Sequence, residues 1–94
     1  MNNIDTLTQQ ADITMYSKDY CPFCVRAKQL FKHLGAEFTE YQVDVERDKL
    51  SEMLERSNGA RSVPQIFIGE QHIGGYDQLY ELHRSKRLDA LLFP

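Results

Sequence analysis

The chain has 94 residues, 41% of them hydrophobic, which is enough for one domain with a hydrophobic core. Eleven basic and fourteen acidic side chains give a formal net charge of −3, so nucleic acid and anionic membrane surfaces are not expected partners. The first residues lack the basic and apolar segments of a signal peptide, and no apolar run is long enough to span a membrane. We therefore expect one soluble, cytoplasmic domain over residues 1–94.

Strand and helix patterns alternate along the first two thirds of the chain. Residues 1–11 predict an N-terminal arm or a short helix. Residues 13–16 form an apolar, strand-like run, and an apolar stripe with helical spacing follows it until Gly35, which predicts a helix end. Residues 38–45 show the alternation of a second strand, and a second helix then leads to the helix stop Ser57-Asn58-Gly59.

A hairpin and a last helix complete the predicted order. Residues 65–68 and 71–73 predict two strands joined by the turn Gly69-Glu70, and Asp77 is predicted to cap the helix that follows. Leucines near the C-terminus predict a terminal turn. The resulting order β-α-β-α-β-β-α predicts an α/β fold with a four-stranded mixed sheet flanked by helices, the first two strands being parallel through a right-handed crossover.

The only two cysteines lie in Cys21-Pro22-Phe23-Cys24, between the first strand and the first helix. Proline is favoured at the first position of a helix, so Pro22 predicts that Cys21 is the N-cap. There its sulfur faces free backbone N–H groups and the positive end of the helix dipole, which stabilise the thiolate that attacks disulfides. Cys24 lies on the same helix face, near enough to form a disulfide. We expect Cys21 to attack and Cys24 to resolve.

Four segments in order resemble the glutaredoxin family, and the resemblance covers residues 12–93. They are Lys18, Cys21-Pro22-Phe23-Cys24, Ser62-Val63-Pro64 and Gly74-Gly75-Tyr76-Asp77. The resemblance implies a thioredoxin-like fold and a dithiol glutaredoxin of the CPxC type. It also implies a glutathione-dependent thiol–disulfide oxidoreductase that reduces protein–glutathione mixed disulfides and protein disulfides.

The resemblance further implies where glutathione binds. In the family the lysine takes the glycyl carboxylate, a cis proline lies beside the active cysteine, and the residue before that proline pairs through its backbone with the cysteinyl part. Backbone amides after the glycine pair take the carboxylate of the γ-glutamyl group, and the aspartate meets its ammonium. Judged by residue type alone, each of the two charged residues has an ordinary structural interpretation beside the binding role. Lys18 fits a solvated surface charge, and Asp77 fits the N-cap of a helix. The residues implied to bind glutathione are Lys18, Val63, Pro64, Gly75, Tyr76 and Asp77.

Glutathione is the expected reducing co-substrate, and thiol–disulfide exchange needs no tightly bound cofactor and no metal. We expect a monomer whose partners are glutathione and glutathionylated or disulfide-containing proteins. Two alternatives stay open: a [2Fe–2S] cluster shared between two protomers with glutathione as a ligand, and an electron carrier fed by thioredoxin reductase. Zinc is disfavoured because no second CxxC motif exists. Phe23, Tyr76 and Asp19 depart from the usual family residues. Phe23 removes a hydroxyl but keeps an aromatic wall, and Asp19 adds an anion that opposes thiolate formation at Cys21.

Overall fold

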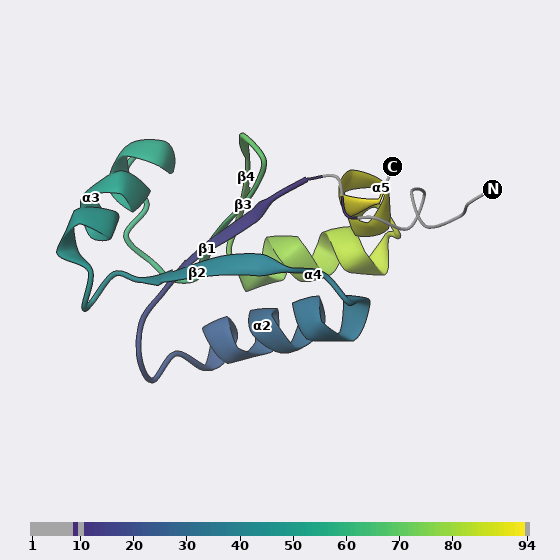
Figure 1. The fold of residues 1–94 in the computed structure, drawn as a ribbon, viewed down its shortest axis with the longest axis horizontal. Helices are drawn as coiled ribbons and strands as arrows, with labels where there is room; N and C mark the ends of the chain where they lie inside the picture. The colour runs from purple at the N-terminus through teal and green to yellow at the C-terminus, as the bar shows by residue number, and fades with distance from the viewer. Residues whose placement is uncertain (1–8, 10, 94) are drawn as a thin grey trace.

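The computed structural model describes residue 9 and residues 11–93, and its centre is a four-stranded sheet (Figure 1). The strands are β1 (Ile13–Ser17), β2 (Phe38–Gln42), β3 (Gln65–Ile68) and β4 (Gln71–Gly74). They lie in the order β2-β1-β3-β4, with β1 parallel to β2 and antiparallel to β3, and β3 antiparallel to β4. The predicted mixed sheet and its parallel first pair are thus confirmed.

Helices cover both faces of this sheet, as predicted. The helix α3 (Arg47–Arg56) packs on one face, and α2 (Pro22–Leu34), α4 (Tyr76–Arg84) and the short α5 (Leu88–Leu92) pack on the other (Figure 1). The predicted order of strands and helices is confirmed, with α5 as the terminal turn. The start of α2 follows the end of β1, so the carboxyl end of a central strand leads directly to the two cysteines.

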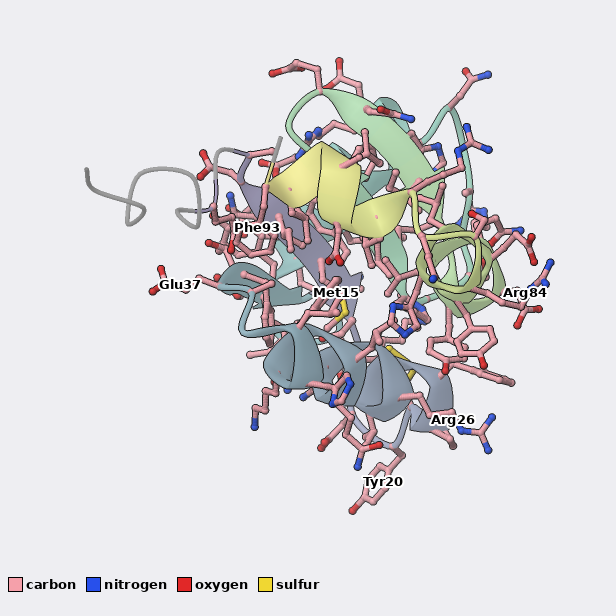
Figure 2. All side chains as sticks on the ribbon, turned by 90° about the vertical axis from the view of Figure 1, so that its right-hand side faces the viewer. Met15, Tyr20, Arg26, Glu37, Arg84 and Phe93 are labelled. Atoms are coloured by element: carbon pink, nitrogen blue, oxygen red, sulfur yellow. A yellow bond between two sulfur atoms is a disulfide. The ribbon has the colours of Figure 1, made fainter. Side chains whose placement is uncertain are left out.

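Alternation along the two central strands separates two hydrophobic cores. In β1, Met15 faces the core under α2, α4 and α5, whereas the next residue, Tyr16, faces α3. Figure 2 shows Met15 in the interior between the sheet and α2. In β3, Ile66 and Phe67 divide in the same way. Successive side chains of a strand point to opposite faces, so strands with helices on both sides are apolar at consecutive positions.

The second strand is shorter than the predicted range of 38–45. It ends at Gln42, whose carbonyl accepts hydrogen bonds from the N–H groups of Val45 and Glu46, at 3.1 Å and 2.8 Å. The chain therefore turns before Val45, which is 71% exposed, although Val43 is buried. The apolar alternation continues through this turn because Val43 packs against Tyr16 in the core under α3.

The first helix ends where the sequence predicts. Gly35 ends α2 in the left-handed conformation, with φ +69°, and its N–H donates to the carbonyl of Lys32, as a glycine helix stop is expected to do.

The prediction of an arm or short helix over residues 1–11 falls mostly on residues outside the described part of the chain. Among the described residues, no helix has the length and apolar character that crossing a membrane requires.

Candidate active site

Cys21 lies at the start of α2, where the sequence places it. It is the N-cap, Pro22 is the first helical residue, and the N–H of Cys24 donates to Cys21 Sγ at 3.1 Å. The Cys21 carbonyl accepts the first bond of the helix, from the N–H of Val25 at 3.1 Å. A cysteine sulfur therefore takes the position in which serine or aspartate usually caps a helix. Negative charge on this sulfur is stabilised by the N–H and by the helix dipole.

The two sulfurs form a disulfide between Cys21 and Cys24, and the Cα atoms of the pair are 5.2 Å apart. The two cysteines differ in exposure: Cys24 is 1% exposed and belongs to the buried residues, whereas Cys21 is half-buried. Tyr20, immediately before the pair, projects away from the molecule (Figure 2) and is 97% exposed. An incoming disulfide therefore reaches Cys21 more easily than Cys24.

The segment before β3 approaches the same sulfur. The Val63–Pro64 peptide bond is cis, as the family resemblance implies, and the Val63 carbonyl oxygen lies 3.9 Å from Cys21 Sγ. This is a contact and not a hydrogen bond in the disulfide form, because a disulfide sulfur has no proton to donate. The backbone of Val63 therefore borders the redox centre directly.

A hollow of about 430 Å³ gathers most of the residues implied to bind glutathione. Its walls come from the start of β3, from β4 and from the start of α4, and Phe23 closes the side nearest the cysteines. Five of the six implied residues line it: Val63, Pro64, Gly75, Tyr76 and Asp77. We call this hollow the groove.

Lys18 lies elsewhere than these five residues. It lines a second hollow, of about 350 Å³, together with Cys21 and Cys24. Lys28 lines the same hollow but is held by Glu40, with Nζ and Oε2 3.2 Å apart. Among the described residues, no carboxylate lies within ion-pair distance of Lys18. Its ammonium is thus free to meet an anion beside the disulfide.

The start of α4 corrects one prediction and adds a residue that the sequence did not reveal. The N-cap is Gly75, whereas Asp77 is the second helical residue, so the prediction that Asp77 caps the helix is wrong. Gly74, with φ +113°, turns the chain into the helix, and Gln78 Oε1 accepts the Gly75 N–H at 2.9 Å. Gln78 thus already satisfies the Gly75 amide. The N–H groups of Tyr76 and Asp77 have no acceptor among the described residues and are the ones free to bind a carboxylate.

The two aromatic residues that depart from the family pattern touch each other. The rings of Phe23 and Tyr76 are stacked with centroids 6.2 Å apart and planes at 29°. Phe23 lies between the cysteines in α2, so this pair links the start of α2 to the start of α4 at the edge of the groove. Phe23 remains 49% exposed, and Arg26 lies over its outer ring face at 5.3 Å. Sequence comparison with the family treats these as two separate departures, but the structure shows one aromatic wall.

The groove also contains polar side chains that sequence reasoning missed, among them Gln65, His72 and Gln78. His72 and Gln65 form a hydrogen bond with each other across β3 and β4, at 2.7 Å. The only sequence signal for Gln65 was a polar residue opening a strand that is otherwise fully apolar. In the structure Gln65 is buried, which a glutamine tolerates only when its amide is hydrogen-bonded.

Comparisons with known proteins show which family the chain belongs to. The glutaredoxin family model matches residues 13–73, which include both cysteines and the cis proline. The chain belongs to the glutaredoxin family. Its disulfide within a CxxC motif fits the dithiol glutaredoxins, and its fold is the thioredoxin-like fold.

Several glutaredoxins are similar over most of their length. A probable glutaredoxin of Synechocystis sp. is 49% identical over 82 residues, which cover 87% of this chain and 93% of the relative. Glutaredoxin 3 of Escherichia coli is 48% identical over 82 residues, covering 87% of this chain and 98% of that protein. The crystal structure of a buckwheat glutaredoxin–glutathione complex superimposes with a TM-score of 0.78 at 35% identity, covering 96% of this chain and 84% of the buckwheat chain. Membership of this family makes the protein a thiol oxidoreductase with a redox function.

Proposed function

We propose that this glutaredoxin uses Cys21 and Cys24 to reduce protein–glutathione mixed disulfides and protein disulfides, with glutathione as the reducing co-substrate. The observation that carries the proposal is the unequal pair: an accessible Cys21 sulfur at a helix N-cap, joined to a buried Cys24, beside a groove with the features implied for glutathione. The buckwheat relative in complex with glutathione supports the choice of co-substrate. We place the protein in the cytoplasm because closely spaced redox cysteines suit a reducing compartment.

For a glutathionylated protein, the Cys21 thiolate attacks the glutathionyl sulfur. A bond forms between Cys21 Sγ and that sulfur, the old disulfide bond breaks, and the protein leaves as a thiolate that takes a proton from water. A second glutathione thiolate then attacks the glutathionyl sulfur on Cys21, which releases glutathione disulfide and restores the Cys21 thiolate. Neither step needs a metal or another cofactor.

For a protein disulfide, Cys21 first forms a mixed disulfide with one protein sulfur and releases the other as a thiol. The Cys24 thiolate then attacks Cys21 Sγ, so the second protein thiol leaves and the disulfide seen in the structure forms. Two glutathione molecules reduce this disulfide. Burial of Cys24 suits the resolving role, because it is reached by its neighbour three residues away and shielded from other disulfides.

The groove orients glutathione for these steps. The free N–H groups of Tyr76 and Asp77 suit the γ-glutamyl carboxylate, the Asp77 carboxylate suits the ammonium, and the backbone of Val63 suits the cysteinyl part. Lys18 in the adjoining hollow suits the glycyl carboxylate. Fixing both ends of glutathione in this way would align its sulfur with Cys21, and alignment is a large part of the advantage of a bound reactant.

Two single variants and two substrates test the assignment. Cys21→Ser is expected to abolish turnover of both a glutathionylated peptide and a protein disulfide, measured with glutathione, glutathione reductase and NADPH. Cys24→Ser is expected to keep reduction of the glutathionylated peptide and to lose most reduction of the protein disulfide, which needs an internal resolving thiol. Equal loss of both activities in Cys24→Ser, or survival of either in Cys21→Ser, would show that the roles are assigned wrongly. Turnover with thioredoxin reductase in place of glutathione would favour the electron-carrier alternative.

A further inference from the structure

A chain of hydrogen bonds joins the outer strand of the sheet to the segment beside Cys21. His72 Nε2 in β4 lies 2.7 Å from Gln65 Oε1 in β3. The Gln65 side-chain amide in turn donates to the Ser62 carbonyl at 2.9 Å and lies 3.3 Å from the Ser62 hydroxyl. Ser62 precedes Val63, whose carbonyl oxygen is 3.9 Å from Cys21 Sγ. We call the linked side chains of His72 and Gln65, with the Ser62 carbonyl, the relay.

The chemistry of the relay fixes where its protons are. The Ser62 carbonyl can only accept, so Gln65 must turn its NH₂ group toward Ser62 and its Oε1 toward His72. Oε1 can also only accept, so His72 must carry a proton on Nε2. Gln65 is 4% exposed whereas His72 is exposed, so the relay runs from the surface of the outer strand to a buried amide that needs hydrogen-bond partners.

The fold holds the His72 ring in the orientation that the relay needs. In the hairpin Phe67 pairs with His72 and Ile68 with Gln71, and the register shifts only beyond them, where Ile73 is left without a partner in the ladder. Cross-strand partners lie on the same face of a sheet, as do residues two apart on one strand, so His72 shares a face with Phe67 and Gln65. The ring stacks on Phe67 with centroids 4.7 Å apart, and Arg56 lies 4.1 Å from the Phe67 centroid.

We propose that His72 is a positioning residue for the exchange reaction. Through Gln65 it fixes the backbone of Ser62 and Val63, the segment that borders Cys21 and lines the groove. The inference rests on the proposed function, because the segment it fixes is the one proposed to pair with the cysteinyl part of glutathione. A merely structural role would require only the stacked ring, whereas the positioning role requires the Nε2 proton.

Substitutions can separate the contribution of the His72 aromatic ring from that of its Nε2 proton. His72→Phe keeps an aromatic ring on Phe67 and removes the donor, and Gln65→Met keeps the side-chain length and removes both relay bonds. Each is expected to raise the KM for a glutathionylated peptide about three- to tenfold, the size of one net hydrogen bond, with kcat changed less than about twofold. His72→Gln is expected to restore KM to within about twofold, because the glutamine Nε2 takes a place close to that of the imidazole Nε2 and donates as it does.

His83 offers a matched control, since it lies in α4 outside the groove and its ring also neighbours an aromatic side chain, Tyr80, at 6.1 Å. His83→Phe is expected to leave KM and kcat unchanged. In the double variant His72→Phe with Gln65→Met, KM is expected to rise no more than in the larger single variant, because both act through one chain of bonds. An unchanged KM in His72→Phe, or a raised KM that His72→Gln does not restore, would overturn the positioning role.

Nuclear magnetic resonance of the imidazole nitrogens tests the relay without using activity. The wild-type protein above the titration range of histidine is expected to show the Nε2–H tautomer for His72, and Gln65→Met is expected to lose that preference and to shift the Val63 amide signal. A Nδ1–H tautomer in the wild type would overturn the relay. A wild-type protein with the expected tautomer but no turnover of glutathionylated peptide would instead refute the proposed function, and with it the role that the relay serves.

Discussion

Lys18 and Lys28 line the same hollow beside the two cysteines but differ in their partners. Glu40 holds the Lys28 ammonium, and it also accepts a hydrogen bond from the Ser17 hydroxyl at 2.6 Å. Lys18 is exposed and meets no carboxylate within ion-pair distance in the described part of the chain. One side chain thus belongs to a surface ion pair, and the other is available to an incoming anion.

Lys18→Met is expected to raise the KM for glutathione about three- to tenfold, because a charge-assisted contact to a ligand carboxylate is lost at an exposed site. It also removes a cation that favours the Cys21 thiolate, so the rate of Cys21 alkylation by iodoacetamide at neutral pH should fall. Lys28→Met is the matched control, and both quantities should stay within about twofold of wild type. Equal effects of the two substitutions would show that Lys18 acts only through general positive charge.

Gly74 lines the groove and has a backbone conformation that residues with a side chain rarely adopt. Its φ of +113° lies outside the range that side chains readily adopt, and a Cβ there would lie 3.1 Å from Gln78 Oε1. Gly74→Ala is expected to lower the free energy of unfolding by about 1–3 kcal/mol and to raise the KM for glutathione, because the turn into α4 must move. Urea unfolding and steady-state kinetics measure the two effects.

Gly69→Ala is the control for conformational strain alone. Gly69 also has a positive φ, +58°, but a Cβ there meets nothing within 4 Å, and the residue lies in the β3–β4 turn away from the groove. We expect a cost in stability of about 1 kcal/mol and no change in KM. A KM shift in Gly69→Ala as large as in Gly74→Ala would mean that the groove responds to general destabilisation.

For single residues, the sequence predicted the structure well where one residue type strongly favours one position or conformation. Pro22 correctly placed Cys21 at the N-cap, and the family motif correctly implied the cis bond before Pro64. It was misleading about Asp77, because aspartate is common both at the N-cap and in the first turn of a helix, and only the backbone shows that Gly75 takes the cap. The contact between His72 and Gln65 was not predicted. The turn at Gly69-Glu70 fixes the register of the hairpin, but it does not fix the side-chain rotamers that bring Nε2 and Oε1 together.

Among the elements, α3 is tied to the sheet by a polar cluster over a buried tyrosine. Tyr16 is fully buried in β1, and its hydroxyl donates to Glu52 and accepts from Arg56 at 3.0 Å. The hydrogen bond from Tyr16 lowers the pKa of Glu52 below its ordinary value, with Lys49 adding to the effect. Burial raises the pKa of Tyr16 above its ordinary value, and the bond to Glu52 raises it further.

The direction of the Glu52 shift predicts how stability depends on pH. A carboxylate whose pKa is lowered by folding stabilises the fold above its unfolded pKa, about 4.5, and this contribution is lost as pH falls through the lower folded value. Glu52→Gln is expected to lower the free energy of unfolding at pH 7 by about 1 kcal/mol or less, since the side chain is partly exposed, and the difference from wild type should vanish on acidification. Urea unfolding at several pH values measures it.

Glu55→Gln provides the control on the same helix, because Glu55 is exposed and joins no ion pair within the described residues. Glu55→Gln removes the same charge from α3, and we expect it to change the free energy of unfolding at pH 7 by less than Glu52→Gln does. A pH-dependent difference in Glu55→Gln as large as in Glu52→Gln would assign the effect to net charge and not to the bond with Tyr16.

The elements themselves were well predicted where one pattern dominates. The apolar stripe before Gly35 defined α2, and the turn at Gly69 defined the hairpin, because both have helical or strand spacing bounded by a residue that stops it. The end of β2 was missed since Val43 is buried by the core beyond the strand. Tertiary packing, which has no local signal, decided that boundary.

For the whole molecule, the proposed chemistry needs neither a metal nor a second chain. The protein supplies only two cysteines, and the structure joins them to each other. We expect protein purified from iron-replete cells to be colourless and to elute as a monomer in gel filtration with and without glutathione. Visible absorption and elution volume measure this, and a brown dimer that requires glutathione would instead support the shared [2Fe–2S] cluster.

The place of Cys21 Sγ at the start of α2 also links oxidation to the folding equilibrium. Folding and reduction form a thermodynamic cycle, so any group that stabilises the folded dithiol more than the folded disulfide makes the folded protein easier to reduce than its unfolded chain. The Cys24 N–H is such a group, because it binds a thiolate more strongly than a neutral disulfide sulfur. The two chemical forms should therefore unfold at different urea concentrations, with the reduced form the more resistant, and each 1.4 kcal/mol between them corresponds to about 30 mV of reduction potential. A single helix cap would in this way help to return the protein to its dithiol form after every turnover.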